Sequence, residues 1–311
     1  MEHKALGRTH LKVSRLGLGT AEIGFAYGIG PRTLPSESEA VDFLKAAVDL
    51  GITFFDTARF YQAAEEHIGK SGITKNEKII VATKCANFLE KKEQLTDAEI
   101  EKRIREEVET SLKLLQVDSL PLLQLHGASE KEIRKGYLLS LLQQLQKEGK
   151  VRFIGISTRG EESPLAALEE GIFDTMQIAY SILDRRMTKK VFPEAEKKNV
   201  GIINRSFLLK GALTPAVEYL HSDLGPLKKN SEKARELAEK NGMELPEMAI
   251  RFALGEAAIS TTLIGTNNLK NLTAALKAIE AGPLAKNILE ELYPLAIDDP
   301  LQVDPAQWPK K

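Results

Sequence analysis

Short apolar stretches recur along the chain, and most are followed by longer stretches in which apolar residues return every three or four positions. The first pattern is typical of buried strands and the second of amphipathic helices. We expect eight strands, at residues 15–20, 52–56, 78–84, 120–126, 151–157, 175–180, 200–204 and 261–265. Strands and helices that alternate in this way predict a parallel α/β fold.

Three of the expected helices begin with a capping box, in which a Ser or Thr side chain and a Glu three residues later each bond the other's backbone. The pairs are Ser36 with Glu39, Thr96 with Glu99, and Ser129 with Glu132. After Thr96, the apolar residues at positions 100, 104, 108, 112 and 115 form one stripe. Eight strands followed by helices over about 250 residues match a closed (β/α)8 barrel better than an open doubly wound sheet.

Three segments fall outside this alternation. Residues 4–14 are expected to form a hairpin that turns at Gly7 and Arg8 and plugs the floor of the barrel. The stretch 206–243 is too long for a plain barrel loop, and residues 228–242 within it predict an extra surface helix. The tail 298–311 shows no periodicity. Because no shift in composition marks a boundary, residues 1–311 are expected to form one domain.

Composition limits what the protein can bind. The 311 residues carry 43 Lys and Arg against 44 Asp and Glu, and this net charge of −1 gives no overall field to hold nucleic acid or an anionic membrane. No run of about 18 apolar residues predicts a membrane span. Cys85 is the one cysteine, which excludes an intrachain disulfide, and strand alternation turns it toward the helices as an inert thiol. Because the sequence shows no secretion signal, we expect a cytoplasmic protein. Because its histidines lack metal-ligand spacing, we expect no metal site.

Ionisable residues end three neighbouring strands. Asp56 ends the second strand, Lys84 the third and His126 the fourth. Alone, Asp56 and Lys84 could be a structural ion pair, and His126 a hydrogen-bonded core histidine. Together they predict an active site, because barrel strands present their C-terminal ends to one cavity, where burying ionisable groups is unfavourable without a function.

Tyr61 follows Asp56 by five residues and can lean over the same cavity. A phenol has an ordinary pKa of about 10, and we expect the Lys84 ammonium to lower that pKa. Asp56 would keep Lys84 charged and in place. This set of residues suits protonation of a carbonyl oxygen as it becomes an alkoxide.

The motifs that hold these residues resemble those of the aldo-keto reductase superfamily over nearly the whole chain. They are GITFFDTARFY at 51–61, VATKC, LLQLHG, GIS ending at Ser157, RSFLLKGALT from Arg205, and LIGTNN from Leu263. The resemblance implies a (β/α)8 TIM barrel with an N-terminal β-hairpin and extra helices. It also implies reversible, NAD(P)H-dependent reduction of an aldehyde or ketone. In that reaction Tyr61 donates the proton, Lys84 and Asp56 adjust the acidity of Tyr61, and His126 orients the carbonyl.

The resemblance also implies a cofactor site that runs across the barrel mouth. Its residues would be Gly19, Thr20, Asp56, Ser157, Thr158, Gln177, Arg205, Ser206, Leu208, Lys210, Gly211, Gly265, Thr266, Asn267 and Asn271. Arg205 replaces a common tyrosine, and its planar guanidinium can also stack on an aromatic ring. NADP(H) is the cofactor implied, but the region after Gly265 lacks the usual cation for a 2′-phosphate, so NAD(H) stays open.

The substrate would contact the first loop at Phe25 and Tyr27, then Arg59, Phe60, Phe88 and Trp308. Arg59 could instead pair with Glu65 or Glu66, and Trp308 could anchor the tail. Two other functions remain open: a cofactor-binding sensor or channel-associated subunit of the same fold with little turnover, and an aldolase that uses Lys84 as a Schiff-base nucleophile. The natural substrate, the physiological direction and the oligomeric state stay undetermined.

Overall fold

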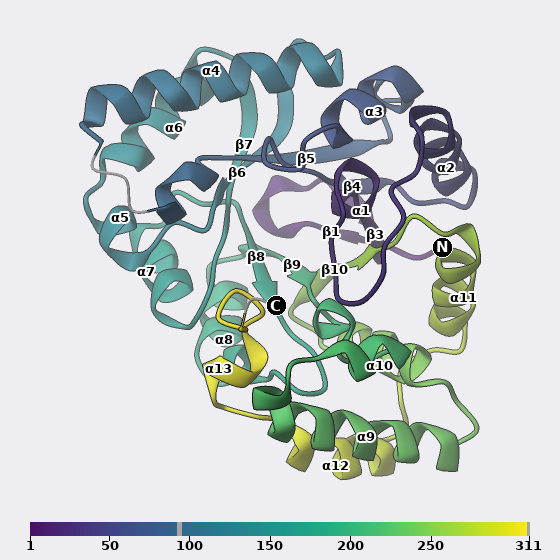
Figure 1. The fold of residues 1–311 in the computed structure, drawn as a ribbon. Helices are drawn as coiled ribbons and strands as arrows, with labels where there is room; N and C mark the ends of the chain where they lie inside the picture. The colour runs from purple at the N-terminus through teal and green to yellow at the C-terminus, as the bar shows by residue number, and fades with distance from the viewer. Residues whose placement is uncertain (92–94, 310–311) are drawn as a thin grey trace.

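A closed barrel of parallel strands forms the centre of the computed structural model, which describes residues 1–91 and 95–309 (Figure 1). In chain order the strands are β3 (Leu16–Gly19), β4 (Phe54–Asp56), β5 (Ile80–Cys85), β6 (Leu120–His126), β7 (Val151–Ser157), β8 (Thr175–Ala179), β9 (Gly201–Arg205) and β10 (Ile259–Gly265). Pairing of β10 with β3 closes the ring. The eight expected strands and the barrel are confirmed, with ends that differ by a few residues.

Side chains along each strand alternate between the barrel interior and the surrounding helices. On β4, Phe54 packs into the inner core, whereas Phe55 packs into the outer core against the helices. Asp56 therefore points into the barrel at its C-terminal mouth. Cys85 is buried in the outer core, as expected from the same alternation.

Helices surround the barrel in the expected alternation (Figure 1). They are α1 (Ala21–Gly24), α2 (Glu37–Asp49), α3 (Ala64–Ser71), α4 (Asp97–Leu115), α5 (Glu130–Arg134), α6 (Tyr137–Lys147), α7 (Glu162–Glu170), α8 (Val191–Lys197), α10 (Leu245–Leu254) and α11 (Leu269–Glu280). All three predicted capping boxes are present, at the starts of α2, α4 and α5. None of the helices within the described ranges is long and apolar enough to cross a membrane.

The N-terminal hairpin consists of β1 (His3–Ala5) and β2 (Lys12–Ser14) and closes the floor of the barrel. Leu6, Leu11 and Val13 are buried in the same cluster as the inward-facing Phe54. The connection between the two strands contains the expected Gly7 and Arg8, which lie in a short 3-10 helix, Gly7–Thr9. That connection docks onto the barrel: the Arg8 backbone N–H donates to the Asn199 carbonyl at 2.7 Å.

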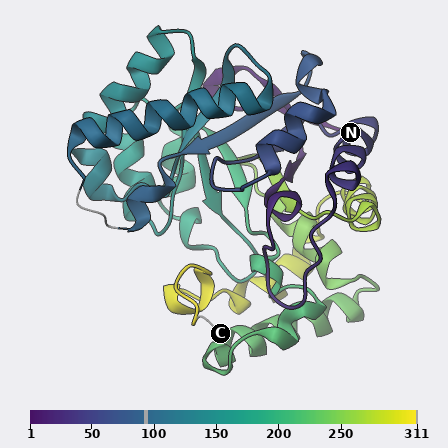
Figure 2. The same ribbon diagram turned by 45° about the horizontal axis from the view of Figure 1, so that its top comes forward.

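Additional segments gather on one side of the barrel (Figures 1 and 2). The predicted surface helix is confirmed as α9 (Gly225–Lys240), beside α12 (Lys286–Leu292). The tail contains a short helix that its sequence did not predict, α13 (Pro300–Val303), and its residues 310 and 311 lie outside the described part. In Figure 2 the yellow tail lies near α9, and the purple loop after α1 reaches the same side. These segments frame the mouth of the barrel.

Candidate active site

Four polar side chains from separate parts of the chain meet at the C-terminal mouth of the barrel. The Lys84 Nζ lies 2.5 Å from the Asp56 Oδ2 and 3.4 Å from the Tyr61 hydroxyl oxygen. The rings of Tyr61 and His126 have centroids 5.9 Å apart and stand nearly perpendicular. The structure therefore brings together the four residues that were expected to converge from the strand ends.

Asp56 is the centre of a buried hydrogen-bond network. Its Oδ1 accepts from the Gln177 side-chain amide at 2.6 Å and from the Gln124 amide at 3.1 Å, while its Oδ2 faces Lys84. The Lys84 Nζ also donates to the Thr57 carbonyl at 2.9 Å. Sequence reasoning missed Gln124, although a glutamine inside the apolar strand LPLLQLH is a usable signal for a buried polar partner. The network fixes both oxygens of Asp56 and so fixes Lys84.

The pKa of the Tyr61 phenol is raised, which contradicts the expected lowering by Lys84. Burial is the largest cause and the Asp56 carboxylate is the second, whereas Arg205 and Arg159 act in the opposite direction. Asp56 lies closer to Lys84 than Tyr61 does, so its negative charge offsets the ammonium that was expected to acidify the phenol. Burial likewise lowers the pKa of Lys84, and Asp56 counteracts that shift. Tyr61 is therefore protonated at neutral pH.

His126 is held in its neutral form. Burial lowers the pKa of its imidazole well below the usual value, and the positive charges of Lys84, Arg159 and Arg205 add to this effect. Its Nδ1 is buried without a hydrogen-bond partner in the structure. A neutral imidazole carries one N–H, which can donate to a carbonyl oxygen placed beside Tyr61.

A cavity of about 690 Å³ opens from Tyr61, Asp56 and Gln177 and extends to β10 and α11. Its lining includes most of the residues expected at the cofactor, namely Gly19, Asp56, Gln177, Arg205, Ser206, Leu208, Lys210, Gly211, Gly265, Thr266 and Asn271. The remaining four do not line it. The Thr20 hydroxyl donates to the Asp56 carbonyl, Ser157 donates to Gln177, and Asn267 donates to Thr33, while the Thr158 carbonyl accepts from Arg205.

The cavity suits a dinucleotide by its size and by its donors. A volume of several hundred Å³ is typical of ligand sites. The amide of Gln177 at one end can bind a carboxamide, the Lys210 ammonium can meet a pyrophosphate, and the small side chains of Ala274 and Ala275 leave room for a planar base. These residues would hold a nicotinamide dinucleotide.

The loop after β9 adopts backbone conformations that side chains disfavour. Ser206, Leu209 and Lys210 all have positive φ, at 63°, 46° and 56°. Such backbone strain clusters at ligand-binding segments, where the surrounding structure maintains it. Two of these residues, Ser206 and Lys210, line the cavity, which supports a ligand-binding role for the loop.

Of the residues that were expected to contact the substrate, some line the cavity and others are bound to different parts of the chain. Tyr27 lines the cavity, with the Lys210 ammonium 5.6 Å from its ring centroid. Arg59 is paired with the buried Glu65, the structural alternative left open by the sequence. Phe88 lies under the Arg103 guanidinium, and Trp308 donates to the Gln302 carbonyl within the tail.

Two aromatic side chains pack against the rings of Tyr61 and His126. Phe25 packs against Tyr61 with ring centroids 5.8 Å apart, and Phe60 packs against His126 at 6.2 Å. Phe60 is half exposed, and Phe25 and Phe60 also contact each other. They form an apolar wall beside the rings of Tyr61 and His126.

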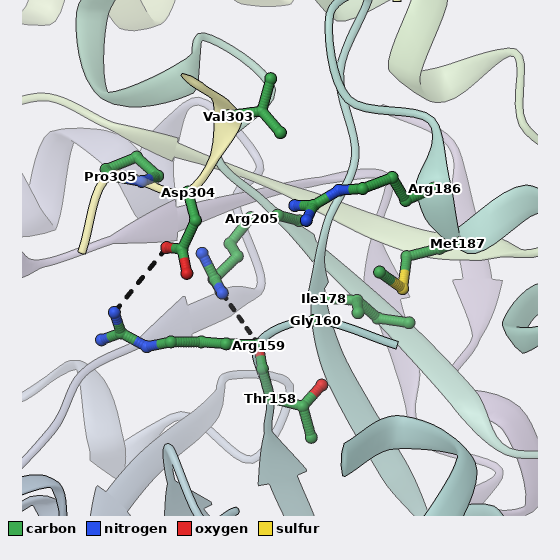
Figure 3. A pocket seen from close by; sticks show the side chains of 11 residues that line it. Thr158, Arg159, Gly160, Ile178, Arg186, Met187, Arg205, Val303, Asp304 and Pro305 are labelled. Carbon is green, nitrogen blue, oxygen red and sulfur yellow. Dashed lines mark hydrogen bonds and ion pairs between the residues drawn. The ribbon is translucent and has the colours of Figure 1, made fainter. Parts of the chain in front are cut away.

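A second, much smaller pocket lies between the end of β7 and the tail (Figure 3). There the Arg205 guanidinium donates to the Thr158 carbonyl at 2.8 Å, and Arg159 lies 3.8 Å from the Asp304 carboxylate. Sequence reasoning did not single out Arg159, although it follows the Ser157–Thr158 pair at the mouth of the barrel. The positive charges of Arg159 and Arg205 also act on the pKa of Tyr61 and of His126, lowering both.

Within the described ranges, no group of three or more His, Cys, Asp or Glu side chains is placed to hold a metal ion.

Comparisons with known proteins identify the family and the fold. The model described as "Aldo/keto reductase family" matches residues 15–294. L-galactose dehydrogenase of Arabidopsis thaliana is 29% identical over 99% of this chain and 97% of its own length. NADH-specific methylglyoxal reductase of Escherichia coli is 26% identical over 85% of this chain and 89% of its own. Among solved structures, the holo form of aldo-keto reductase AKR11C1 from Bacillus halodurans superposes with a TM-score of 0.78, at 26% identity, over 96% of this chain and 97% of that one.

Proposed function

The chain belongs to the aldo/keto reductase family, and we propose that it reduces an aldehyde or ketone to the alcohol with NAD(P)H, reversibly. One observation carries this proposal: the Tyr61 hydroxyl lies 3.4 Å from the Lys84 ammonium, at the end of a cavity large enough for a dinucleotide. The printed names of two relatives, a reductase of methylglyoxal and a dehydrogenase of L-galactose, support both directions of the reaction.

In this reaction the bound cofactor supplies a hydride to the carbonyl carbon. Tyr61 donates its phenolic proton to the carbonyl oxygen as that oxygen takes up the electron pair of the broken π bond. The raised pKa of Tyr61 keeps the proton in place at neutral pH, and the transfer stays favourable because an alkoxide is a stronger base than a phenolate.

The neighbouring residues act on that proton. The Lys84 ammonium stabilises the phenolate that forms, and Asp56 holds Lys84 in position. The neutral His126 donates its ring N–H to the carbonyl oxygen and so orients the substrate beside Tyr61. In the oxidation direction the same proton transfer runs backwards, from the alcohol to the Tyr61 phenolate that Lys84 stabilises.

An aldolase mechanism through Lys84 is disfavoured by the position of its amine. A Schiff base requires the neutral amine to attack a carbonyl carbon. The Lys84 side chain is fully buried, and its Nζ is directed at Asp56 and at the Thr57 carbonyl. A cofactor-binding subunit with little turnover would keep the cavity but would not need the buried Tyr61, Lys84 and Asp56 arrangement.

The proposed function is tested by incubating the purified protein with NADPH or NADH and a panel of simple aldehydes and ketones, while the absorbance of the reduced nicotinamide is followed. We expect loss of absorbance that depends on the carbonyl compound and forms the alcohol in equal amount. Cofactor binding without turnover of any compound would favour the binding subunit. Trapping of a substrate on Lys84 by borohydride would favour the aldolase.

A further inference from the structure

The cavity has two chemically different ends. One end is formed by Asp56, Tyr61 and Gln177, and the other by Gly265 of β10 and by α11 from Asn271 onward. If the proposed function holds, the nicotinamide must lie beside Tyr61, because the hydride has to reach a carbonyl carbon whose oxygen contacts that residue. The end at β10 and α11 is then left for the adenosine half of the cofactor.

Glu22 lies at the adenosine end. It belongs to α1, directly after β3, which pairs with β10. Its carboxylate faces the cavity beside Gly265, where an added Cβ atom would be 3.6 Å from the Glu22 Oε1. Its backbone carbonyl accepts a weak hydrogen bond of 3.5 Å from the Asn267 amide. The side chain is only 14% exposed, so its charge is poorly screened by water.

Carboxylates outnumber cations in this part of the lining. Glu244 and Glu247 line the cavity together with Glu22, and the Glu247 carboxylate is offset by Arg251 at 3.1 Å, which leaves Glu244 as the extra negative charge. Arg32 is the one cation there among the described lining residues, and its guanidinium lies 3.7 Å from the Glu22 carboxylate, which already offsets it.

The other two lining cations belong to the nicotinamide half. Arg205 is bonded to the Thr158 carbonyl beside β7, and Lys210 lies over the Tyr27 ring. A 2′-phosphate at the adenosine end would therefore meet a net negative charge.

The start of α11 offers few hydrogen-bond donors that could compensate a 2′-phosphate for this negative charge. The Asn268 side chain accepts from the Lys270 backbone N–H at 2.8 Å, and the Thr266 hydroxyl accepts from the Asn268 N–H at 3.1 Å. The Asn271 amide also donates to Thr266, at 3.3 Å. The N–H groups of Asn268 and Lys270 and the side-chain amide of Asn271, which could otherwise bind a phosphate at this helix N-terminus, are thus already bonded within the turn.

We infer that Glu22 makes the enzyme select NAD(H) over NADP(H), because its carboxylate can accept hydrogen bonds from the ribose hydroxyls of NAD(H) and repels the 2′-phosphate of NADP(H). The same logic operates in other dinucleotide sites, where an acidic residue binds the 2′-hydroxyl and a cation is needed for the 2′-phosphate. Repulsion of the wrong ligand is as effective for selectivity as attraction of the right one. Burial raises the pKa of Glu22 to about 7, so the carboxylate is mostly ionised at about pH 8.

Equilibrium binding tests this inference without any substrate. The purified protein is titrated with NADH and, separately, with NADPH at about pH 8, and the dissociation constants are taken from the cofactor fluorescence. The variants are Glu22→Gln, which keeps the shape of the side chain, and Arg32→Gln. Glu170→Gln is the matched control, because Glu170 is an exposed carboxylate at the end of α7 that does not line the cavity.

We expect the wild type and Glu170→Gln to bind NADH at least about tenfold more tightly than NADPH, a difference of about 1.4 kcal/mol. Glu22→Gln should narrow this ratio, mainly through tighter binding of NADPH, and Arg32→Gln should not narrow it. Three results would each overturn the inference and leave the proposed function standing: NADPH bound as tightly as NADH by the wild type, an unchanged ratio in Glu22→Gln, or a tenfold loss of NADPH affinity alone in Arg32→Gln. If neither cofactor binds, both this inference and the proposed function fail.

Discussion

Lys84 and Asp56 form an ion pair inside the barrel, with the Lys84 Nζ 2.5 Å from the Asp56 Oδ2 and no solvent exposure of the lysine side chain. Because water cannot solvate either charge there, each depends on the other and on the hydrogen bonds from Gln124, Gln177 and to Thr57. The pair fixes an ammonium beside the Tyr61 phenol.

Removing one member of this pair should destabilise the fold strongly. In Lys84→Met the Asp56 carboxylate remains buried without its cation, and we expect a loss of about 3–5 kcal/mol in the free energy of unfolding. The double variant Lys84→Met/Asp56→Asn should recover part of that loss, because the amide needs no counter-charge. Urea unfolding of the two single variants and the double variant measures the coupling.

The matched control for this double-mutant cycle is Lys286→Met. It removes an exposed lysine that lies 3.7 Å from Glu290 on α12, and we expect it to leave the unfolding curve unchanged. Additive effects of the Lys84 and Asp56 substitutions would show that the two charges do not depend on each other.

His126 should remain neutral across the physiological pH range. Its pKa is lowered well below 6.5 by burial and by nearby positive charges, so protonation begins only in more acidic solution. The NMR signal of its ring, assigned by its loss in His126→Asn, should show no titration step between about pH 6.5 and about pH 8. A midpoint within that interval would mean that the imidazole is charged in part and orients the substrate in another way.

Glu22 should make stability depend on pH. Its folded pKa of about 7 lies above the ordinary value of 4.5, so the stability it contributes is fully present below about pH 4.5 and is lost as the pH rises through about 7. Relative to Glu22→Gln, which does not titrate, the wild type should lose up to about 3 kcal/mol between about pH 5 and about pH 8. Urea unfolding at both pH values provides the comparison, and a constant difference between the two proteins would rule out a buried, titrating carboxyl.

Gly7 should tolerate no side chain. Its φ is +53°, and an added Cβ atom would lie 2.2 Å from the Gly201 backbone nitrogen, so Gly7→Ala must displace the hairpin from the barrel floor. Gly242→Ala is the control, since Gly242 also has a positive φ, +69°, but no atom lies within 4 Å of the added Cβ. We expect Gly7→Ala to lower the free energy of unfolding by at least about 2 kcal/mol more than the control. Equal losses in thermal or urea unfolding would show that the close approach to Gly201 is not limiting.

The barrel could be predicted from the sequence because its signals are local. Each strand is a short apolar run, each of the three capping boxes lies within four residues, and the alternation along β4 and β5 turns Asp56 and Lys84 inward. The helix α13 could not be predicted, since a four-residue helix that starts at a proline has too few positions to show a period.

Features that depend on distant parts of the chain were harder to predict. The raised pKa of Tyr61 follows from how fully the phenol is buried and from the position of Asp56 relative to Lys84, and residue types do not carry this information. Glu22 was overlooked for the same reason: nothing around it in the sequence places it beside Gly265, more than two hundred residues away.

The central claim is that Tyr61 donates the proton in carbonyl reduction, and Tyr61→Phe tests it most directly. The phenylalanine keeps the ring that packs against Phe25 and His126 and removes only the hydroxyl beside Lys84. Tyr137→Phe is the control, because its hydroxyl donates to the Asp97 carbonyl at the surface. We expect kcat for an aldehyde to fall by about 10²–10⁴-fold in Tyr61→Phe, with cofactor affinity unchanged and full activity in the control. Turnover at the wild-type rate in Tyr61→Phe would contradict the claim.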